Sequence, residues 1–244
     1  MKKTNCQEST WNLIWQTNTT KNSYSSREWR DERADDKIGL FIQNGINFKA
    51  NEKVLDAGCG DGSILFALKN HFDINIIGVD FSEKALVSAE RNSIRKGYPI
   101  TVLKADTRKL PFESSSLDKI FSLGVIEHLE DPQNAIDELA RCLIEDGVLI
   151  LMTPNKYSFG RIDRLFKKLT GTWKFGHQDE YSIDELSHFT KKSGLTIFKK
   201  QVVKRKRFKN DSFAFKLIFI IDSIIGAFIS NWGFYSYIYA CKKI

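Results

Sequence analysis

The 244-residue sequence contains only four cysteines and four prolines. The cysteines stand at positions 6, 59, 142 and 241, so no two are close enough in sequence to form a zinc-binding or redox-active pair. Scattered thiols of this kind are typical of a reducing compartment. The two lysines at the N-terminus are followed by no apolar run, which argues against a signal peptide. We therefore expect a cytoplasmic protein.

An apolar run long enough to span a membrane is also lacking. Residues 213–230 (FAFKLIFIIDSIIGAFIS) come nearest, but Lys216 and Asp222 interrupt a run that would need roughly 20 apolar residues. We predict a buried helix here, with a helix in the membrane interface as the alternative. Residues 199–209, just before it, hold seven basic residues and no acid. A basic run is most often a solvated face, but together the two segments also predict peripheral contact of 199–230 with the inner face of an anionic membrane.

What the sequence does contain is an alternation of strand and helix patterns. Seven β-rich runs predict strands, at 53–57, 75–80, 100–105, 118–124, 147–153, 195–203 and 234–242. Helical patterns fill the intervals 62–70, 83–96, 133–144 and 183–193. The last of these follows Ser182, a typical N-cap with Glu185 three residues on. Such alternation predicts an α/β fold with a mostly parallel sheet and helices on both faces.

Three segments lie outside the alternation. Residues 1–50, with a helix near 26–44, are predicted to form an N-terminal helical cap, and 51–244 the main domain. Within it, 156–181 holds six basic residues against three acidic ones and is predicted to be an insert on the substrate side. The apolar 213–230 segment would be a helix between the sixth and seventh strands.

The strongest local signal is VLDAGCGDGSILFAL at 54–68, where an apolar strand runs into three alternate glycines and then a helix. Glycines at such a turn let the chain bend sharply and let a ligand approach the backbone. Dinucleotide-binding proteins use a similar turn, but with the spacing Gly-x-Gly-x-x-Gly, so Gly62 comes one residue early. The next strand ends in Asp80, twenty residues past Gly60, where a carboxylate can accept hydrogen bonds from both hydroxyls of a ribose.

Two further strand ends carry polar residues toward the same edge of the sheet. The third strand runs into Asp106, whose carboxylate can accept a hydrogen bond from the exocyclic amine of an adenine. The fourth runs into SLGVIEHLEDP at 122–132, a loop that would lie beneath the ligand. Ligands of open α/β sheets bind beyond the carboxyl ends of the strands.

These motifs resemble the class I S-adenosylmethionine (SAM)-dependent methyltransferases, in particular the group that includes the ubiquinone- and menaquinone-biosynthesis enzymes. The similarity covers about 52–155 through LDAGCGDG, GVDFSEKAL, KADTRKLPFESSSLDKIFSLGVIEHLEDP and DGVLILMTPN. It implies SAM as cofactor and a Rossmann-like seven-stranded sheet with an antiparallel last strand. It also implies cofactor contacts by Asp56, Gly58 and Gly60 at the methionine end, with Cys59 in the same turn, by Asp80 and Phe81 at the ribose, by Asp106 and Thr107 at the adenine, and by Leu123 near the sulfonium.

Some quinone O-methyltransferases of this group carry Glu-x-x-Glu-His after the fourth strand, where the acids and the histidine bind magnesium. Here Gly124 stands at the position of the first acid, so no metal is expected. Candidates for a general base are His128, Glu127 and His177, the last at a place where the family often has a histidine near the acceptor. A hydrogen-bonded structural role is the alternative for each histidine.

The predicted function is therefore SAM-dependent methylation, favouring an oxygen, of a small-molecule or lipid-linked acceptor such as a quinone-like compound or a cell-envelope glycan precursor. The alternatives are an RNA methyltransferase, an NAD-dependent Rossmann oxidoreductase and a non-catalytic SAM-binding scaffold. A DNA substrate is disfavoured, because neither an Asp/Asn-Pro-Pro-aromatic motif nor a Pro-Cys pair follows the fourth strand.

Overall fold

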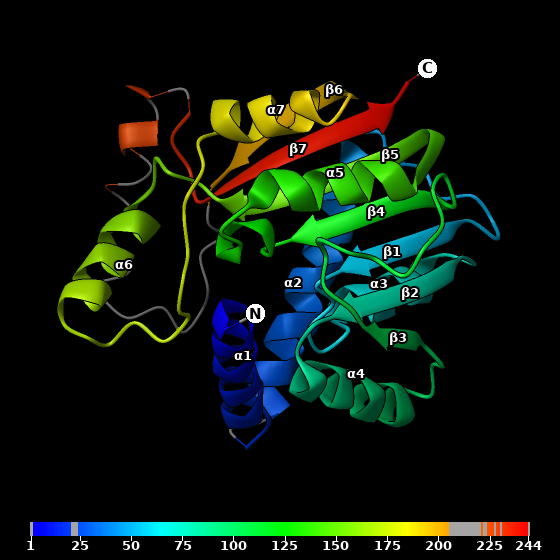
Figure 1. The fold of residues 1–244 in the computed structure, drawn as a ribbon, viewed down its shortest axis with the longest axis horizontal. Helices are drawn as coiled ribbons and strands as arrows, with labels where there is room; N and C mark the ends of the chain where they lie inside the picture. Colours follow the sequence, from blue (N-terminus) through cyan, green and yellow to red (C-terminus); the bar gives the residue numbers. More distant parts are fainter. Residues whose placement is uncertain are drawn as a thin grey trace.

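A seven-stranded sheet of order β3-β2-β1-β4-β5-β7-β6 forms the centre of the molecule (Figure 1). The computed structural model describes residues 2–20, 24–204, 221, 224–226, 228–229 and 231–243. The strands are β1 (Lys53–Ala57), β2 (Asn75–Asp80), β3 (Thr101–Lys104), β4 (Leu117–Leu123), β5 (Leu143–Pro154), β6 (Leu195–Val203) and β7 (Tyr235–Lys242). Strands β1 to β5 pair in parallel, and β7 runs antiparallel to both β5 and β6. The predicted Rossmann-like α/β fold with an antiparallel last strand is confirmed.

Alternate residues of the central strands enter two different cores, as the two-residue period of a strand requires. Leu55 and Leu149 belong to one core, which α5 (Pro132–Cys142) and α7 (Ile183–Lys192) cover. Val54 and Ile150 belong to the other, beneath α2 (Tyr24–Gln43) and α3 (Ser63–His71). The helix that connects β2 to β3, α4 (Glu83–Lys96), packs on these two strands. Both faces of the sheet are therefore covered by helices. Because β1 to β5 are parallel, their carboxyl ends lie along one edge of the sheet.

The ends of the helices follow the capping signals of the sequence. Ser182 accepts a hydrogen bond from the backbone N–H of Glu185, and the Glu185 carboxylate accepts one from the N–H of Ser182, which completes the predicted capping box of α7. Ser82 caps α4 in the same position. The largest difference from the predicted boundaries is at β5, which begins at Leu143, directly after α5, because Leu143 pairs with Leu117 before the main register of β4 and β5 starts.

The N-terminal segment forms two helices, where the sequence predicted one near 26–44. The additional helix, α1 (Lys2–Thr20), lies beside α4 and across the carboxyl ends of the strands (Figure 1). Polar contacts hold it: the Asn12 side-chain oxygen accepts hydrogen bonds from the Ser82 hydroxyl at 2.7 Å and from the N–H of Lys84 at 3.3 Å. Helix α1 was missed because most of its residues are polar and its few apolar residues do not gather on one side.

A second unpredicted helix, α6 (Phe159–Leu169), lies within the basic 156–181 segment and stands apart from the sheet at the left of Figure 1. The apolar helix predicted at 213–230 lies outside the described residues except at 221, 224–226 and 228–229, and the basic run is described only as far as 204. Among the helices formed by described residues, none combines the length and apolarity that a membrane crossing requires.

Candidate active site

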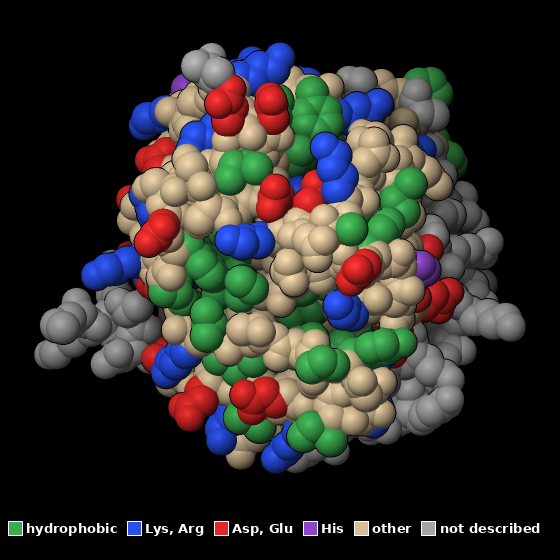
Figure 2. Space-filling model, turned by 90° about the vertical axis from the view of Figure 1, so that its right-hand side faces the viewer, with side chains coloured by type: hydrophobic (Ala, Val, Ile, Leu, Met, Phe, Trp, Pro, Cys, Tyr) green, Lys and Arg blue, Asp and Glu red, His purple; other side chains and the backbone are tan. Residues whose placement is uncertain are grey.

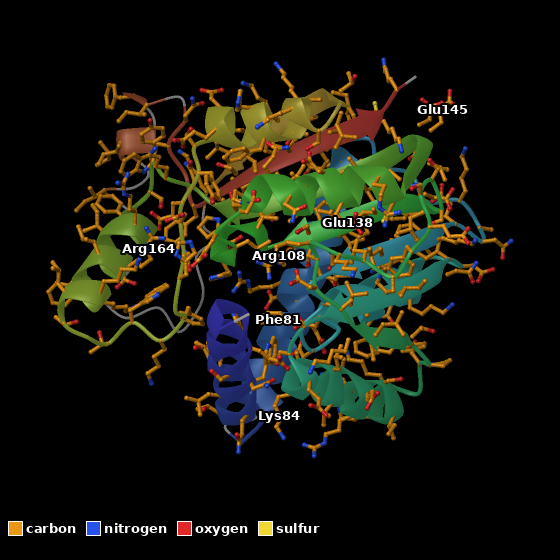
Figure 3. The ribbon with its side chains drawn as sticks, viewed as in Figure 1. Phe81, Lys84, Arg108, Glu138, Glu145 and Arg164 are labelled. Carbon is orange, nitrogen blue, oxygen red and sulfur yellow. The ribbon has the colours of Figure 1, made fainter. Side chains whose placement is uncertain are left out.

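A cavity of about 270 Å³ opens at the carboxyl ends of β1, β2 and β4, beneath α1. Its lining includes every residue that the sequence assigned to a cofactor: Asp56, Gly58, Cys59, Gly60, Asp80, Phe81, Asp106, Thr107 and Leu123. His128 lines it as well. Figure 3 shows Phe81 and Arg108, both from this lining, where the strand ends meet α1. Four distant segments of the sequence thus meet at one site, as the strand-end motifs predicted.

The glycine turn after β1 is tightly enclosed. Gly58 and Gly60 have φ angles of +92° and +55°, in the left-handed region that side chains disfavour. A Cβ atom on Gly60 would lie 2.7 Å from the Trp15 ring of α1, and one on Gly58 would lie 2.2 Å from a methyl group of Val125. Only glycine leaves the cavity open at these two positions.

Asp80 joins the end of β2 to the glycine turn. One carboxylate oxygen accepts a hydrogen bond from the N–H of Gly60 at 3.0 Å, and the other accepts one from the N–H of Ser82 at 2.9 Å. Burial raises the pKa of Asp80 to about 6, although these backbone hydrogen bonds oppose the rise. The group is therefore mostly ionised at neutral pH. Each oxygen can accept a further hydrogen bond, so the carboxylate can bind a pair of hydroxyls of a ligand in the cavity.

The charge of the cavity is predominantly acidic. Four carboxylates line it, those of Asp56, Asp61, Asp80 and Asp106, against the cations of Lys37 and Arg108. Arg108 is paired with Asp106, since its Nε and Nη2 donate hydrogen bonds to that carboxylate at 3.0 and 2.6 Å. Burial acts to raise the pKa of Asp106, but the hydrogen bonds from Arg108 outweigh it and lower the pKa. A cavity with this balance favours a ligand that carries positive charge.

The N-terminus of α3 is occupied by the chain itself. Asp61 accepts hydrogen bonds from the hydroxyl of Ser63 at 2.5 Å and from its N–H at 3.3 Å. In dinucleotide-binding proteins the corresponding helix N-terminus receives a pyrophosphate, whose negative charge the helix dipole stabilises. A carboxylate already fills that role here, so the site disfavours a pyrophosphate and, with it, NAD.

Lys37 of α2 is a cavity residue that sequence reasoning missed. Burial, and then the nearby Arg33, lower its pKa to about 8, while Asp56 and Glu127 act in the opposite direction. Burial raises the pKa of the neighbouring Asp56 to about 7, and Lys37 opposes that rise. Trp11 and Trp15 of α1 also line the cavity. These three residues precede the motif-bearing region, so no spacing rule could place them in the site.

Of the three predicted general bases, only His128 faces the cavity. Its Nδ1 lies 2.8 Å from the backbone oxygen of His177, and because a carbonyl only accepts, Nδ1 must carry the proton and Nε2 the lone pair. Burial lowers the pKa of His128 to about 4, so the ring is neutral at physiological pH. The His177 ring is absent from the lining and lies 3.3 Å from the Asp179 carboxylate. Glu127 lies behind the cavity wall, 2% exposed.

The Glu127 carboxyl is predicted to bind a proton at neutral pH in the folded protein. Burial raises its pKa from 4.5 to about 8, and its Oε2 is buried without a hydrogen-bond partner among the described residues. The unfolded chain loses this proton near pH 4.5 and the folded chain near pH 8, so the contribution of Glu127 to stability declines as the pH rises between these values. We expect Glu127→Gln to remove that decline.

The measurement is the difference in unfolding free energy between wild type and Glu127→Gln from about pH 4 to about pH 9. Wild type should lose stability relative to the variant by at most about 1.4 kcal/mol per pH unit within the window, and by nothing further outside it. A difference that is flat with pH would show that Glu127 is ionised in the fold. The slope, rather than the absolute stability, is decisive because an amide in this position has its own burial cost.

Comparison with known proteins shows which proteins these features are similar to. Residues 55–151 match the model of the methyltransferase domain. A probable S-adenosylmethionine-dependent methyltransferase of Mycobacterium tuberculosis is 36% identical over 109 residues, which are 43% of this chain and 37% of that protein. The demethylmenaquinone methyltransferase of Thermus thermophilus is 29% identical over 122 residues, 48% of this chain and 56% of that protein. The chain thus spans about half the length, or less, of these relatives.

The fold extends the similarity beyond the matched region. A chain of the Haloferax volcanii complex between the Trm112 methyltransferase activator and its candidate methyltransferase superposes with a TM-score of 0.67 at 16% sequence identity, over 96% of this chain and 95% of that one. The seven-stranded order 3-2-1-4-5-7-6 is the class I methyltransferase arrangement.

Proposed function

We propose that this chain, which belongs to the class I SAM-dependent methyltransferases, methylates an oxygen of a small-molecule or lipid-linked acceptor. The observation that carries the proposal is the acidic cavity at the strand ends, with a neutral histidine in its wall. When bound, SAM supplies an electrophilic methyl group on a sulfonium. The lining fits such a molecule, since it combines carboxylates for cationic groups with a carboxylate placed for a diol.

The residues that would hold SAM are those the strand-end motifs selected. Asp80 would accept hydrogen bonds from the ribose hydroxyls, and Asp56 would face the amino-acid end, near Gly58 and Gly60. Asp106, oriented by Arg108, would lie at the adenine. Helix α1, with Trp15 against Gly60, would exclude water from the ligand, which strengthens each of these electrostatic contacts.

His128 is the residue best placed to handle the acceptor proton. Its Nδ1 is held by the His177 carbonyl, so its Nε2 is an acceptor with a fixed direction. A hydroxyl bound in the cavity would donate its proton toward Nε2 and turn its lone pair to the methyl donor. Aromatic rings border this position, with Trp11 edge-on to His128 at 4.8 Å and Phe175 at 6.1 Å from Trp11. Such a border suits an acceptor with a flat or apolar body, such as a quinone-like ring.

Titration calorimetry with SAM, S-adenosylhomocysteine and NADH tests the cofactor assignment directly. We expect binding of the first two and none of NADH, whose pyrophosphate meets Asp61 at the end of α3. Transfer of an isotopically labelled methyl group to a panel of phenols, quinols, polyprenyl-linked glycans and RNA then tests the acceptor class. NADH binding without SAM binding would refute the proposal, and SAM binding without transfer to any acceptor would favour a scaffold.

Replacing His128 with alanine is expected to lower kcat about 100-fold for a hydroxyl acceptor, near the lower end of the range for a general base because the pKa of His128 is low. Affinity for SAM should change little, since the ring is on the acceptor side. Added imidazole should restore part of the rate. His177→Ala is the matched control: it keeps the backbone carbonyl that orients His128 and should cost far less. Equal losses in the two variants would contradict the role of His128.

A further inference from the structure

Helix α6 presents an apolar stripe to solvent. Ile162, Leu165, Phe166 and Leu169 follow the spacing i, i+3, i+4, i+7, which places them on one side of a helix. Their exposed fractions are 57%, 58%, 65% and 79%. An apolar stripe with this spacing normally faces the core of a soluble domain, yet α6 has no buried residue.

The orientation of α6 is fixed by its polar side. Arg164, with a side chain only 12% exposed, donates from Nη2 to Glu180 at 2.5 Å, and the Glu180 side chain is 3% exposed. Arg161 lies 3.8 Å from the same carboxylate. At the start of the helix, Phe159 packs edge-on against Trp232 at 5.4 Å. Figure 3 shows Arg164 between α6 and the body of the protein. Arg164 therefore holds the inner side of the helix against Glu180, and the apolar stripe faces outward.

The surroundings of the stripe are basic. Lys167, Lys168 and Lys174 lie next to it in sequence, and Asp163, the one acid on the helix, is 2.6 Å from Lys167. The buried Glu180 carboxylate pairs with Arg164, and the half-exposed Arg161 lies beside it. The opposite side of the molecule differs, because Figure 2 shows acidic and basic side chains mixed over it with scattered apolar ones. A continuous apolar stripe bordered by lysines complements a surface whose outer layer is anionic and whose interior is apolar.

We propose that α6 docks this protein on an anionic lipid membrane, with its apolar stripe inserted among the acyl chains and its lysines at the headgroups. The segment after α6 leads to Phe175, whose ring centroid lies 6.1 Å from that of Trp11, a residue of the cavity lining. Docking through α6 therefore brings the acceptor side of the cavity close to the membrane surface. The inference goes beyond methyl transfer itself, and it narrows the acceptor to a membrane-borne lipid if the proposed function holds.

Flotation with vesicles tests the docking. Wild type should float with phosphatidylglycerol-containing vesicles and far less with pure phosphatidylcholine vesicles, and the difference should shrink in high salt. Phe166→Glu should lower the partition coefficient at least about tenfold, because it replaces an inserted aromatic ring by a charge. Ile94→Glu on α4 is the matched control, an 83% exposed isoleucine far from α6. It should float like wild type.

Failure of wild type to float with anionic vesicles overturns the proposal and would leave α6 as a surface for another protein. Equal flotation of Phe166→Glu and wild type also overturns it. Circular dichroism and SAM calorimetry on the same preparations check that each variant is folded. Because the calorimetry does not involve lipid, a missing SAM signal would count against the proposed function and a missing flotation signal against the docking.

Discussion

Replacing Asp80 with alanine is expected to weaken SAM binding about 10²–10⁴-fold. Two hydrogen bonds from ribose hydroxyls to a carboxylate contribute about 1.5–3 kcal/mol each, and both would be lost. The substitution also removes the acceptors for the N–H groups of Gly60 and Ser82, so the glycine turn would no longer be held against β2. Titration calorimetry with S-adenosylhomocysteine measures the effect without any need for an acceptor.

Asp80→Asn separates the two roles of the carboxylate. It keeps the shape of the side chain and one oxygen acceptor but removes the charge, so we expect an intermediate loss of affinity. Asp118→Ala removes a carboxylate that accepts from the backbone of Lys53, away from the cavity, and should leave affinity unchanged. An Asp80→Ala protein that binds S-adenosylhomocysteine like wild type would remove the main physical support for the cofactor site.

Gly58→Ala is expected to destabilise the fold by about 2–5 kcal/mol. A side chain at φ +92° carries strain of roughly 1–2 kcal/mol, and the collision of its Cβ with Val125 at 2.2 Å adds an overpacking cost of about 1–3 kcal/mol. Chemical denaturation of the ligand-free protein gives the free energy of unfolding directly.

Two companion variants separate strain from collision. Gly45 has a φ of +85°, and a Cβ there would meet nothing within 4 Å, so Gly45→Ala should show the strain cost alone. Gly58→Ala combined with Val125→Ala should recover most of the collision cost, because the methyl groups that the new Cβ meets are gone. If Gly45→Ala and Gly58→Ala cost the same, the close contact with Val125 contributes nothing.

The strand-end residues could be predicted because their positions follow from sequence order alone. Asp80 ends β2 and Asp106 follows the end of β3, and the carboxyl ends of neighbouring parallel strands meet at one edge of the sheet. No comparable rule covers Lys37 or Trp15. Their places in the cavity depend on how α1 and α2 dock on the finished sheet, which no local pattern encodes.

Helix α6 escaped prediction for a related reason. Its apolar residues are regularly spaced, but the helix is only 11 residues long. The segment that contains it is distinguished in sequence by its basic charge rather than by this spacing. A sequence pattern gives the apolar side of a helix but cannot say whether that side faces a core. For α6 the answer depends on Arg164 and Glu180, sixteen residues apart in the chain. The rings of His128 and His177 also face different surroundings, since only that of His128 lines the cavity. The path of the chain between them decides this, and their spacing in sequence does not specify that path.

The contact of Trp15 with the glycine turn shows that two separate parts of the chain build the cavity. The matched methyltransferase region, 55–151, supplies the strand ends, whereas the indoles that cover them come from α1. A change in α1 would therefore alter this cover and leave the groups at the strand ends in place. A replacement of α1 would have to keep the hydrogen bond between Asn12 and Ser82, which joins the two parts.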